Sequence, residues 1–358
     1  MSRTPAPPAS SVRRGRSHGW FPWALAALLP LCLVWASGIG SSGLGWSHLL
    51  RAGAESLGLA APTLDEVDRA ILLNVRLSRV VLAALVGGGL ATAGVVFQGI
   101  LLNPLADPYT VGVSSGAALG ASVAILLGLG GYTALGLGLL PAAAFAGALL
   151  ALGAVHLLAA GRGYSGSGTL ILAGIVVSTT LSAGISLLKS LNEESVSSIV
   201  FWIMGSFSGR GWGHVAFCAP YVAAGLLAAL WLGRDLDLLV LGDEGARQLG
   251  VDSRRVRRVL LVAASLLTGA CVSVSGVIGF VGLVVPHLLR MVLGPSHRRL
   301  LVSSFLGGGV LLTLADALSR TLLPRGEELP VGVVTALLGG PFFCWLLRLD
   351  PLARRGRS

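Results

Sequence analysis

The strongest constraint on the fold is a series of ten apolar segments separated by short polar stretches. A helix needs about 20 apolar residues to cross the hydrocarbon core of a bilayer, and the segments are close to this length. They lie at residues 20–38, 80–102, 112–129, 134–160, 169–190, 215–233, 257–276, 278–294, 299–323 and 330–348. Only 12% of the residues are charged, whereas soluble domains carry about 25%. The sequence therefore predicts an all-α polytopic membrane protein with about ten transmembrane helices.

Lys and Arg residues indicate which side of the membrane each loop faces, because cytosolic loops are enriched in them. If the N-terminus is cytosolic, 18 of the 26 Lys and Arg residues lie in cytosolic segments and 8 lie outside. We therefore expect both termini in the cytosol. Residues 1–19 are expected to form a disordered basic tail, residues 20–349 the membrane domain, and residues 350–358 a second cytosolic tail.

The sequence contains a faint internal repeat. The stretch RLSRV, which starts at Arg76, returns as RVRRV at Arg255, and Pro104 matches Pro286 at nearly the same offset, as Gly94-Val95 matches Gly276-Val277. Five segments separate the copies, so two five-helix halves would have opposite orientations, as in many transporters. In so biased a composition, chance explains three short matches about equally well.

The sequence lacks the P-loop of ATP-binding proteins and the HExxH motif of zinc proteases. A P-loop requires GxxxxGK[ST], whose lysine reaches the phosphates, but the one lysine, Lys189, lies in LLKSL. HExxH does not occur, and the four cysteines are far apart, without metal-binding spacing. We therefore expect no enzymatic activity, no metal and no cofactor. The net charge of +10 fits loop topology better than nucleic-acid binding.

Two polar features lie near the predicted outer surface. Asp316 and Arg320 are four residues apart in the ninth segment, so they share a helix face and can pair near its outer end. Residues 63–79 form an amphipathic segment that we expect on the outer surface, and Thr63 and Glu66 have the spacing of a capping box.

The stretch ILLNPLADPYTVGVSSGA interrupts two apolar segments at residues 100–117. Proline removes a backbone donor and disfavours helix at the residue before it. We expect Asn103 and Pro104 to end one helix, and Asp107 and Pro108 to hold a cytosolic turn open before the next.

The cytosolic loop after the sixth segment, residues 234–257, contains a short polar helix. It is predicted at Asp243–Leu249, between Gly242 and Gly250. Acidic residues at its start suit the positive end of a helix dipole. The loop is too short to be a domain, but it is long enough to dock on one.

Several motifs resemble those of a known transporter family. The segment RLSRVVLAALVGGGLATAGVVFQGILLNPLADPYTVGVSSGAALGA resembles permease subunits of binding-protein-dependent ABC importers for iron–siderophore complexes, haem and vitamin B12. LGDEGARQLGVD, GFVGLVVPHLLR and ELPVGVVTALLGGPFFCWLLR are similar to the same family. The resemblance covers about residues 65 to 349, with the motifs in order and at family-like spacing.

The resemblance implies a transport function and a set of partners. A permease of this family has ten spans, sits in the cytoplasmic (inner) membrane of a bacterium and works as a dimer on two ATPase subunits. An extracytoplasmic binding protein delivers the substrate, and the implied substrate is a ferric siderophore or a related metal chelate. Vitamin B12 and haem remain alternatives, and the second permease is either an identical copy or a paralogue.

The resemblance also assigns roles to residues. Arg76, Arg79 and Arg320 match positions that pair with glutamates of the binding protein, and fixed positive charges can steer an acidic partner. Residues that match the element coupled to the ATPase are Gly242, Asp243, Glu244, Gly245, Ala246, Arg247, Leu249 and Gly250.

The gate and path are assigned in the same way. Ser165, Ser167 and Thr169 correspond loosely to the cytosolic gate, because GSGT departs from the more basic or bulkier versions of that loop. The fifth and tenth segments would line the path.

Two other classes of function are a secondary carrier or channel, and a polytopic membrane enzyme. The long cytosolic loop and the lack of an intramembrane acid relay count against the first, and the lack of a catalytic cluster counts against the second.

Overall fold

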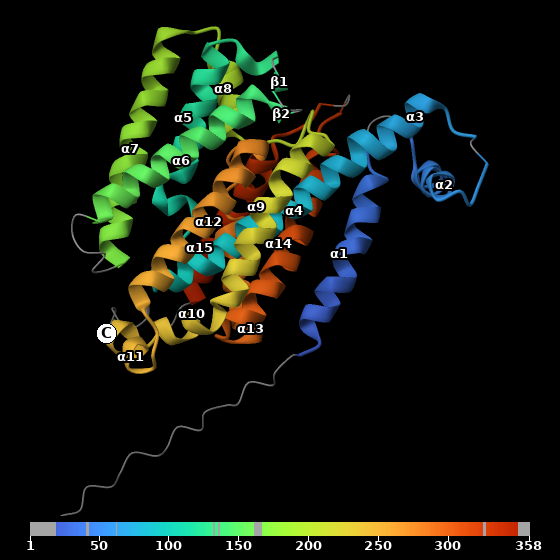
Figure 1. Cartoon of the computed structure of the whole chain (residues 1–358). Coiled ribbons are helices and arrows are strands. Elements are labelled where there is room, and N and C mark those ends of the chain that lie inside the picture. The colour runs from blue at the N-terminus through green and yellow to red at the C-terminus, as the bar shows by residue number, and fades with distance from the viewer. Residues whose placement is uncertain are drawn as a thin grey trace, which may run out of the picture.

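The computed structural model describes residues 19–40, 43–61, 63–131, 133–134, 137–160, 167–324 and 327–349. Within these residues, ten apolar helices form one bundle (Figure 1). They are α1 (Phe21–Ser37), α4 (Ser78–Ile100), α5 (Val113–Leu126), α6 (Leu139–Ala160), α7 (Ser167–Leu191), α9 (Trp212–Trp231), α12 (Ser253–Ser275), α13 (Val281–Leu293), α14 (His297–Ser319) and α15 (Val331–Leu349). Each coincides with one predicted segment, which confirms the all-α polytopic fold.

Short elements connect these helices. They are α2 (Trp46–Ser56), α3 (Glu66–Ala70), the π-helix η1 (Ile71–Leu77), the 3-10 helices η2 (Pro108–Val111) and η3 (Leu129–Gly131), the strands β1 (Thr133–Ala134) and β2 (Leu137–Gly138), α8 (Val196–Ile203), α10 (Gly233–Leu239) and α11 (Gly242–Gln248). The two strands pair as a small antiparallel hairpin. The sequence did not predict α8 or the π-helix.

Exposed tryptophans mark the two surfaces at which the bundle meets the membrane boundary. Trp20 and Trp23 lie at the start of α1, and Trp231 lies at the end of α9. Trp46 and Trp212 begin α2 and α9 at the opposite end of the bundle. Indole rings favour the level of the lipid headgroups. With the predicted orientation, the first group marks the cytosolic end, where α10 and α11 lie, and the second marks the outer end (Figure 1).

Helix α4 runs through the centre of the bundle and is buried over almost its whole length (Figure 1). It packs against α9, α12, α13 and α14. Glycines allow these close approaches: a Cβ on Gly87 would overlap the carbonyl oxygen of Gly308, and a Cβ on Gly94 would overlap that of Gly282. Small residues at helix contacts are typical of packing in lipid, where no hydrophobic force drives helices together.

Two interruptions of the helical backbone meet inside the bundle. One is the turn at residues 101–112, which contains η2, and the other joins α12 to α13 at residues 276–280. The Tyr109 hydroxyl donates to the Ile278 carbonyl oxygen (2.7 Å) and accepts from the Ile278 amide (3.1 Å). Irregular backbone at membrane depth is stable only where protein supplies such partners. Each interruption therefore helps to stabilise the other.

The position of Gly282 shows how deep this meeting point lies. A Cβ on Gly282 would be 2.6 Å from Pro108 Cδ and 2.8 Å from the Leu90 carbonyl oxygen. Leu90 precedes Ile100, the end of α4, by almost three helical turns, which is about 15 Å along the axis. The chain thus leaves α4 at the cytosolic end and returns into the bundle before α5 begins. This return explains why α5 is short.

The predicted turn has its own hydrogen bonds. The Asn103 Oδ1 atom accepts from the Leu105 amide (2.9 Å). Asp107 caps η2, since its Oδ1 accepts from the Tyr109 amide (2.9 Å) while its own amide donates to Thr110 Oγ1 (3.1 Å). These side-chain hydrogen bonds stabilise the turn, in which the prolines prevent the α-helix from continuing.

The predicted capping box at Thr63 and Glu66 is wrong. The N-cap of α3 is Asp65, and the Thr63 amide and hydroxyl both donate to Glu55 Oε1 (2.8 and 3.0 Å). These hydrogen bonds, led by the Thr63 amide, lower the pKa of the Glu55 carboxyl. The amphipathic segment is also continuous with α4 through η1, so Glu66–Ile100 is one helix of 35 residues.

The order of elements repeats once along the chain. In the first half, α1 precedes two short helices and then α4, α5, α6 and α7; in the second, α9 precedes two short helices and then α12, α13, α14 and α15. The third span of each half is short and follows an interruption. Five spans per half give the two halves opposite orientations, as predicted. The match of Pro104 with Pro286 is wrong, because Pro104 lies in a turn and Pro286 lies inside α13.

Gly94→Ala is expected to lower the thermal unfolding midpoint of the purified protein, because the new Cβ would overlap the Gly282 carbonyl. Overpacking of this kind typically costs about 1–3 kcal/mol. Gly153→Ala in α6 is the control, because a Cβ there meets no atom within 4 Å. Midpoints measured in the same detergent check this prediction. Equal midpoints for the two variants would contradict the close contact of α4 with α13.

Candidate functional site

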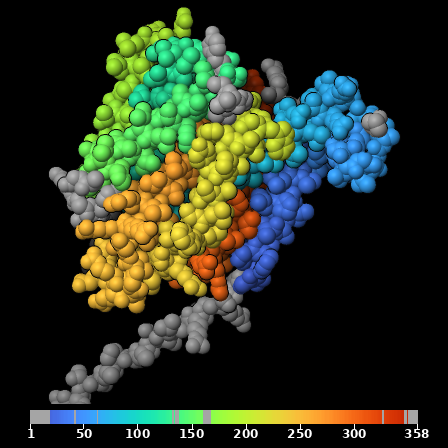
Figure 2. Space-filling view, viewed as in Figure 1, coloured from blue at the N-terminus to red at the C-terminus, as the bar shows by residue number. Residues whose placement is uncertain are grey.

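The cytosolic end carries a small protruding element built from α10 and α11, seen at the lower left of Figure 2. Gly242 and Gly250 have φ angles of +84° and +85°, which glycine adopts without steric cost. The first bends the chain between α10 and α11, and the second ends α11. The predicted helix at Asp243–Leu249 is confirmed, displaced by one residue.

Helix α11 is held by one face and exposes the other. Ala246 is fully buried against the core that includes Leu236 and Leu239 of α10. Asp243 Oδ1 forms a salt bridge with Arg257 Nη2 of α12 (3.0 Å). Residues that project from the exposed face are Glu244, Arg247, Gln248 and Leu249. The element is therefore fixed to the bundle and presents both charged and apolar groups outward.

A groove of about 690 Å³ runs beside this element, between α10 and the turn that joins α13 to α14. Its walls are Asp237, Val240, Leu241, Met291, Val292, Leu293, Gly294, Pro295, Ser296 and Arg299. The sequence did not predict it, because its two sides are about fifty residues apart and each reads as an ordinary helix end.

At the outer end, Arg79 lies between two carboxylates. Its Nη2 is 2.9 Å from Asp316 Oδ1, and its Nη1 is 2.8 Å from Glu328 Oε2. These contacts tie α4 to α14 and to the segment before α15. Asp316 is almost fully buried, and a buried carboxylate is stable only when it is paired and hydrogen-bonded. The sequence did not predict that Arg79 and Glu328 belong to one network with Asp316, because no local pattern joins residues so far apart.

Arg320 completes the network at the same place. Its Nε is 3.2 Å from Asp316 Oδ2, which confirms the predicted pair. Its Nη1 and Nη2 donate to the carbonyl oxygens of Ile39 (2.7 Å) and Ala36 (3.1 Å), just after and within α1. One buried carboxylate thus links α1, α4 and α14 through two arginines.

The three arginines that the sequence assigned to docking are all buried in the single chain. Arg76, Arg79 and Arg320 are 5%, 7% and 8% exposed, and Arg76 Nη1 donates to the Leu44 carbonyl oxygen (2.9 Å). They lie together at the outer end, where they hold the chain's own elements. Their contact with a binding protein stays a prediction.

The predicted gate residues are described only in part. Ser165 lies outside the described residues. Ser167 is the first residue of α7, and Thr169 lies in the first turn of that helix and is partly exposed.

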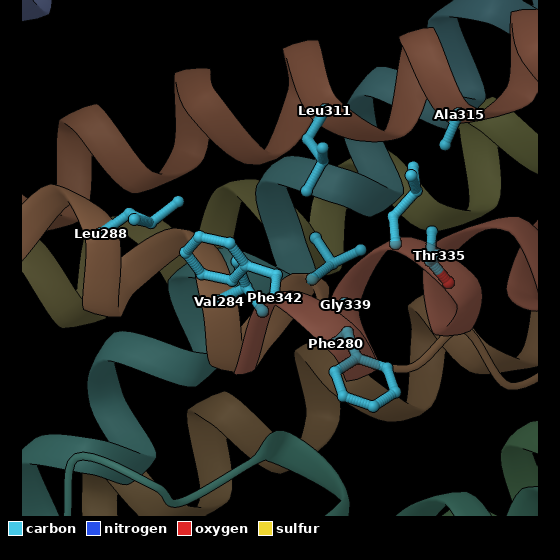
Figure 3. Close-up of a pocket in the computed structure, with 10 residues that line it drawn as sticks. Phe280, Val284, Leu288, Leu311, Ala315, Thr335, Gly339 and Phe342 are labelled. Carbon is cyan, nitrogen blue, oxygen red and sulfur yellow. The ribbon is translucent and has the colours of Figure 1, made fainter. Parts of the chain in front are cut away.

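An apolar cavity of about 230 Å³ lies between α15 and the pair α13 and α14 (Figure 3). Its walls are Phe280, Val281, Val284, Leu288, Leu311, Ala315, Thr335, Leu338, Gly339 and Phe342. Phe280 has a φ of +68°, which residues other than glycine rarely adopt. A Cβ on Gly339 would overlap the ring of Phe280. Helix α15 therefore rests on the end of one interruption and has unfilled space beside it.

Three relatives are similar to this chain over most of their length. An ABC transporter permease protein of Bacillus subtilis, YvrB, is 46% identical over 292 residues, which cover 79% of this chain and 80% of that protein. The cobalamin import system permease protein BtuC of Halobacterium salinarum is 44% identical over 308 residues, covering 86% and 80%. The hemin transport system permease protein HmuU of Yersinia pestis is 41% identical over 287 residues, covering 80% and 85%.

A solved structure and a family description agree with these relatives. The structure, described as an inward-facing conformation of a metal-chelate type ABC transporter, superposes with a TM-score of 0.79 at 33% identity and covers 92% of this chain and 99% of that one. The description of the FecCD transport family matches residues 28–349. The match runs from the middle of α1 to the end of α15, so this chain belongs to the FecCD transport family.

Proposed function

We propose that this chain is the permease subunit of a binding-protein-dependent ABC importer in the cytoplasmic membrane of a bacterium. The observation that carries the proposal is α11, a short helix fixed to the bundle by Ala246 and by the bond between Asp243 and Arg257, with its other face exposed. A short helix that is fixed in this way can transmit the movement of a partner protein to the bundle. The chain supplies the path and the coupling, and a separate ATPase subunit hydrolyses ATP.

The proposed substrate is a ferric siderophore or a related large metal chelate. Relatives named for cobalamin, hemin and iron-citrate import support this class of ligand. Cobalamin and haem are the alternatives within the same class. A second permease, identical or paralogous, two ATPase subunits and an extracytoplasmic binding protein complete the proposed assembly.

The proposed path runs along α7 and α15. Exposed residues of α7 include Leu172, Ile175 and Val176, and exposed residues of α15 include Leu337 and Leu338. Apolar walls of this kind suit a large ligand that is carried by shape, without tight polar binding. The cavity beside α15 leaves room for that helix to shift (Figure 3). Ser165, Ser167 and Thr169 remain the proposed gate at the cytosolic end of α7.

The alternative of a secondary carrier is less well supported. Among the ten apolar helices that the structure describes, Asp316 is the one acidic residue. Arg79 and Arg320 both bind it, so it is not available to carry a proton or a cation. An external source of energy, such as an ATPase, fits this arrangement better.

Glu244→Trp is expected to abolish most substrate uptake while ATP hydrolysis by the assembled complex continues, because a bulky ring on the exposed face of α11 separates it from its partner. Uptake by proteoliposomes is measured with a panel of ferric siderophores, haem and cobalamin, which also identifies the substrate. Glu194→Trp is the control, because it changes an exposed glutamate at the outer end. Normal uptake by Glu244→Trp would remove α11 from the coupling.

Arg76→Gln is expected to weaken binding-protein docking about tenfold, which corresponds to about 1.4 kcal/mol, because a positive charge near the outer end is lost. Glutamine retains a donor for the Leu44 carbonyl, so the thermal midpoint should change little. Arg51→Gln, an exposed arginine of α2, is the matched control. Affinity is measured with the purified binding protein and permease. Unchanged affinity for Arg76→Gln would exclude Arg76 from the interface.

A further inference from the structure

We propose that the ATPase subunit contacts the permease at a second place, the groove between α10 and the α13–α14 turn. The inference rests on the proposed function and extends the contact surface beyond α11. It makes the α13–α14 turn, which the sequence did not single out, part of the interface.

Large apolar side chains line this groove and are uncovered. Leu241 and Met291, on its opposite sides, are 62% and 69% exposed, and Val240 and Val292 extend the same surface. Exposed apolar patches with a polar rim mark contact sites for other proteins or for membranes. Leu241 directly precedes Gly242, so a protein that covers α11 also reaches the groove.

The rim of the groove favours a protein over lipid as the occupant. It carries charges of both signs, with Asp237 on α10 and Arg299 on α14. It also lies at the turn of Gly294 and Pro295, where the chain has left α13. An apolar centre with a polar rim is the usual anatomy of a protein interface.

One test compares the affinity of the ATPase subunit for permease variants in nanodiscs. Met291→Arg is expected to raise the dissociation constant at least tenfold, because it places a charge in the apolar centre. Leu105→Arg is the matched control, because Leu105 is exposed in a cytosolic turn and does not line the groove.

The outcomes separate this inference from the proposed function. If Glu244→Trp weakens binding and Met291→Arg does not, the second contact is overturned and the coupling role of α11 stands. If neither variant changes the affinity, the second contact is also overturned, and the uptake assay of Glu244→Trp alone decides the coupling role of α11. If the thermal midpoint changes with the lipid composition of the nanodiscs while the affinity of the ATPase subunit does not change, the groove contacts lipid. This result would overturn the inference.

A second inference concerns a polar contact at the rim of the groove. Asp237 Oδ1 lies 2.6 Å from His297 Nδ1 and accepts from the His297 amide at 2.9 Å. The His297 side chain is 1% exposed, next to Gly99 of α4. Because a carboxylate only accepts, Nδ1 carries the hydrogen. The pair fastens α10 to the first turn of α14.

We infer that Asp237 is a positioning residue that passes movement of the ATPase contact to α14. The two helices that this contact joins explain the role. Helix α10 leads into α11, and α14 carries Asp316 and Arg320 at its other end. A helix of 23 residues is rigid enough to join the groove to the outer network.

Asp237→Ala is expected to reduce the substrate molecules imported per ATP hydrolysed at least fivefold. Asp237→Asn retains an acceptor for the His297 amide and should restore most of the ratio. Both are measured in the complete complex in proteoliposomes. A wild-type ratio in Asp237→Ala, or equal defects in the two variants, would overturn the inference. If Asp237→Ala is not recovered, Asp237→Ser, too short to reach His297, replaces it with the same expected result.

Discussion

The structure depends on one constraint: no backbone polar group can be left without a partner inside a bilayer. Two interruptions of helical backbone lie within the bundle, and they satisfy this constraint by meeting each other. Tyr109 on one side bonds both the amide and the carbonyl of Ile278 on the other. The two interruptions precede the short spans α5 and α13, and one of them carries Phe280, on which α15 rests.

The two ends of the bundle use different means to hold helices together. At the outer end, the carboxylate of Asp316 binds Arg79 and Arg320, and a fully paired network is needed because the carboxylate is buried. At the cytosolic end, Asp237 binds the ring and the amide of His297, and most of the surface around it is apolar and exposed. The outer end is thus held by the chain itself, whereas the cytosolic end exposes the surface at which we propose the ATPase contact.

Sequence reasoning located the ten spans and the α11 helix, since apolar length and a pair of flanking glycines are local signals. It also placed Asp316 with Arg320, because four residues make one helical turn. It missed Glu328 as a partner of Arg79 and Ile278 as a partner of Tyr109, which are far apart along the chain and have no local mark. It assigned a capping box to Thr63, but a distant buried carboxylate, Glu55, competes for the same donors. Tertiary contacts decide these cases, and a single sequence does not encode them as patterns.

The central position of α4 has a consequence for how the protein is made. Four of the helices that enclose α4, namely α9, α12, α13 and α14, are synthesised after it. Before these helices are inserted, we expect the glycine-lined surface of α4 to face lipid. Arg79 then has no contact with Asp316, which lies 237 residues further along the chain. A long basic side chain near a helix end can reach the headgroups in the meantime. Assembly of the bundle is therefore late and concerted: the second helix to enter the membrane is among the last to find its place.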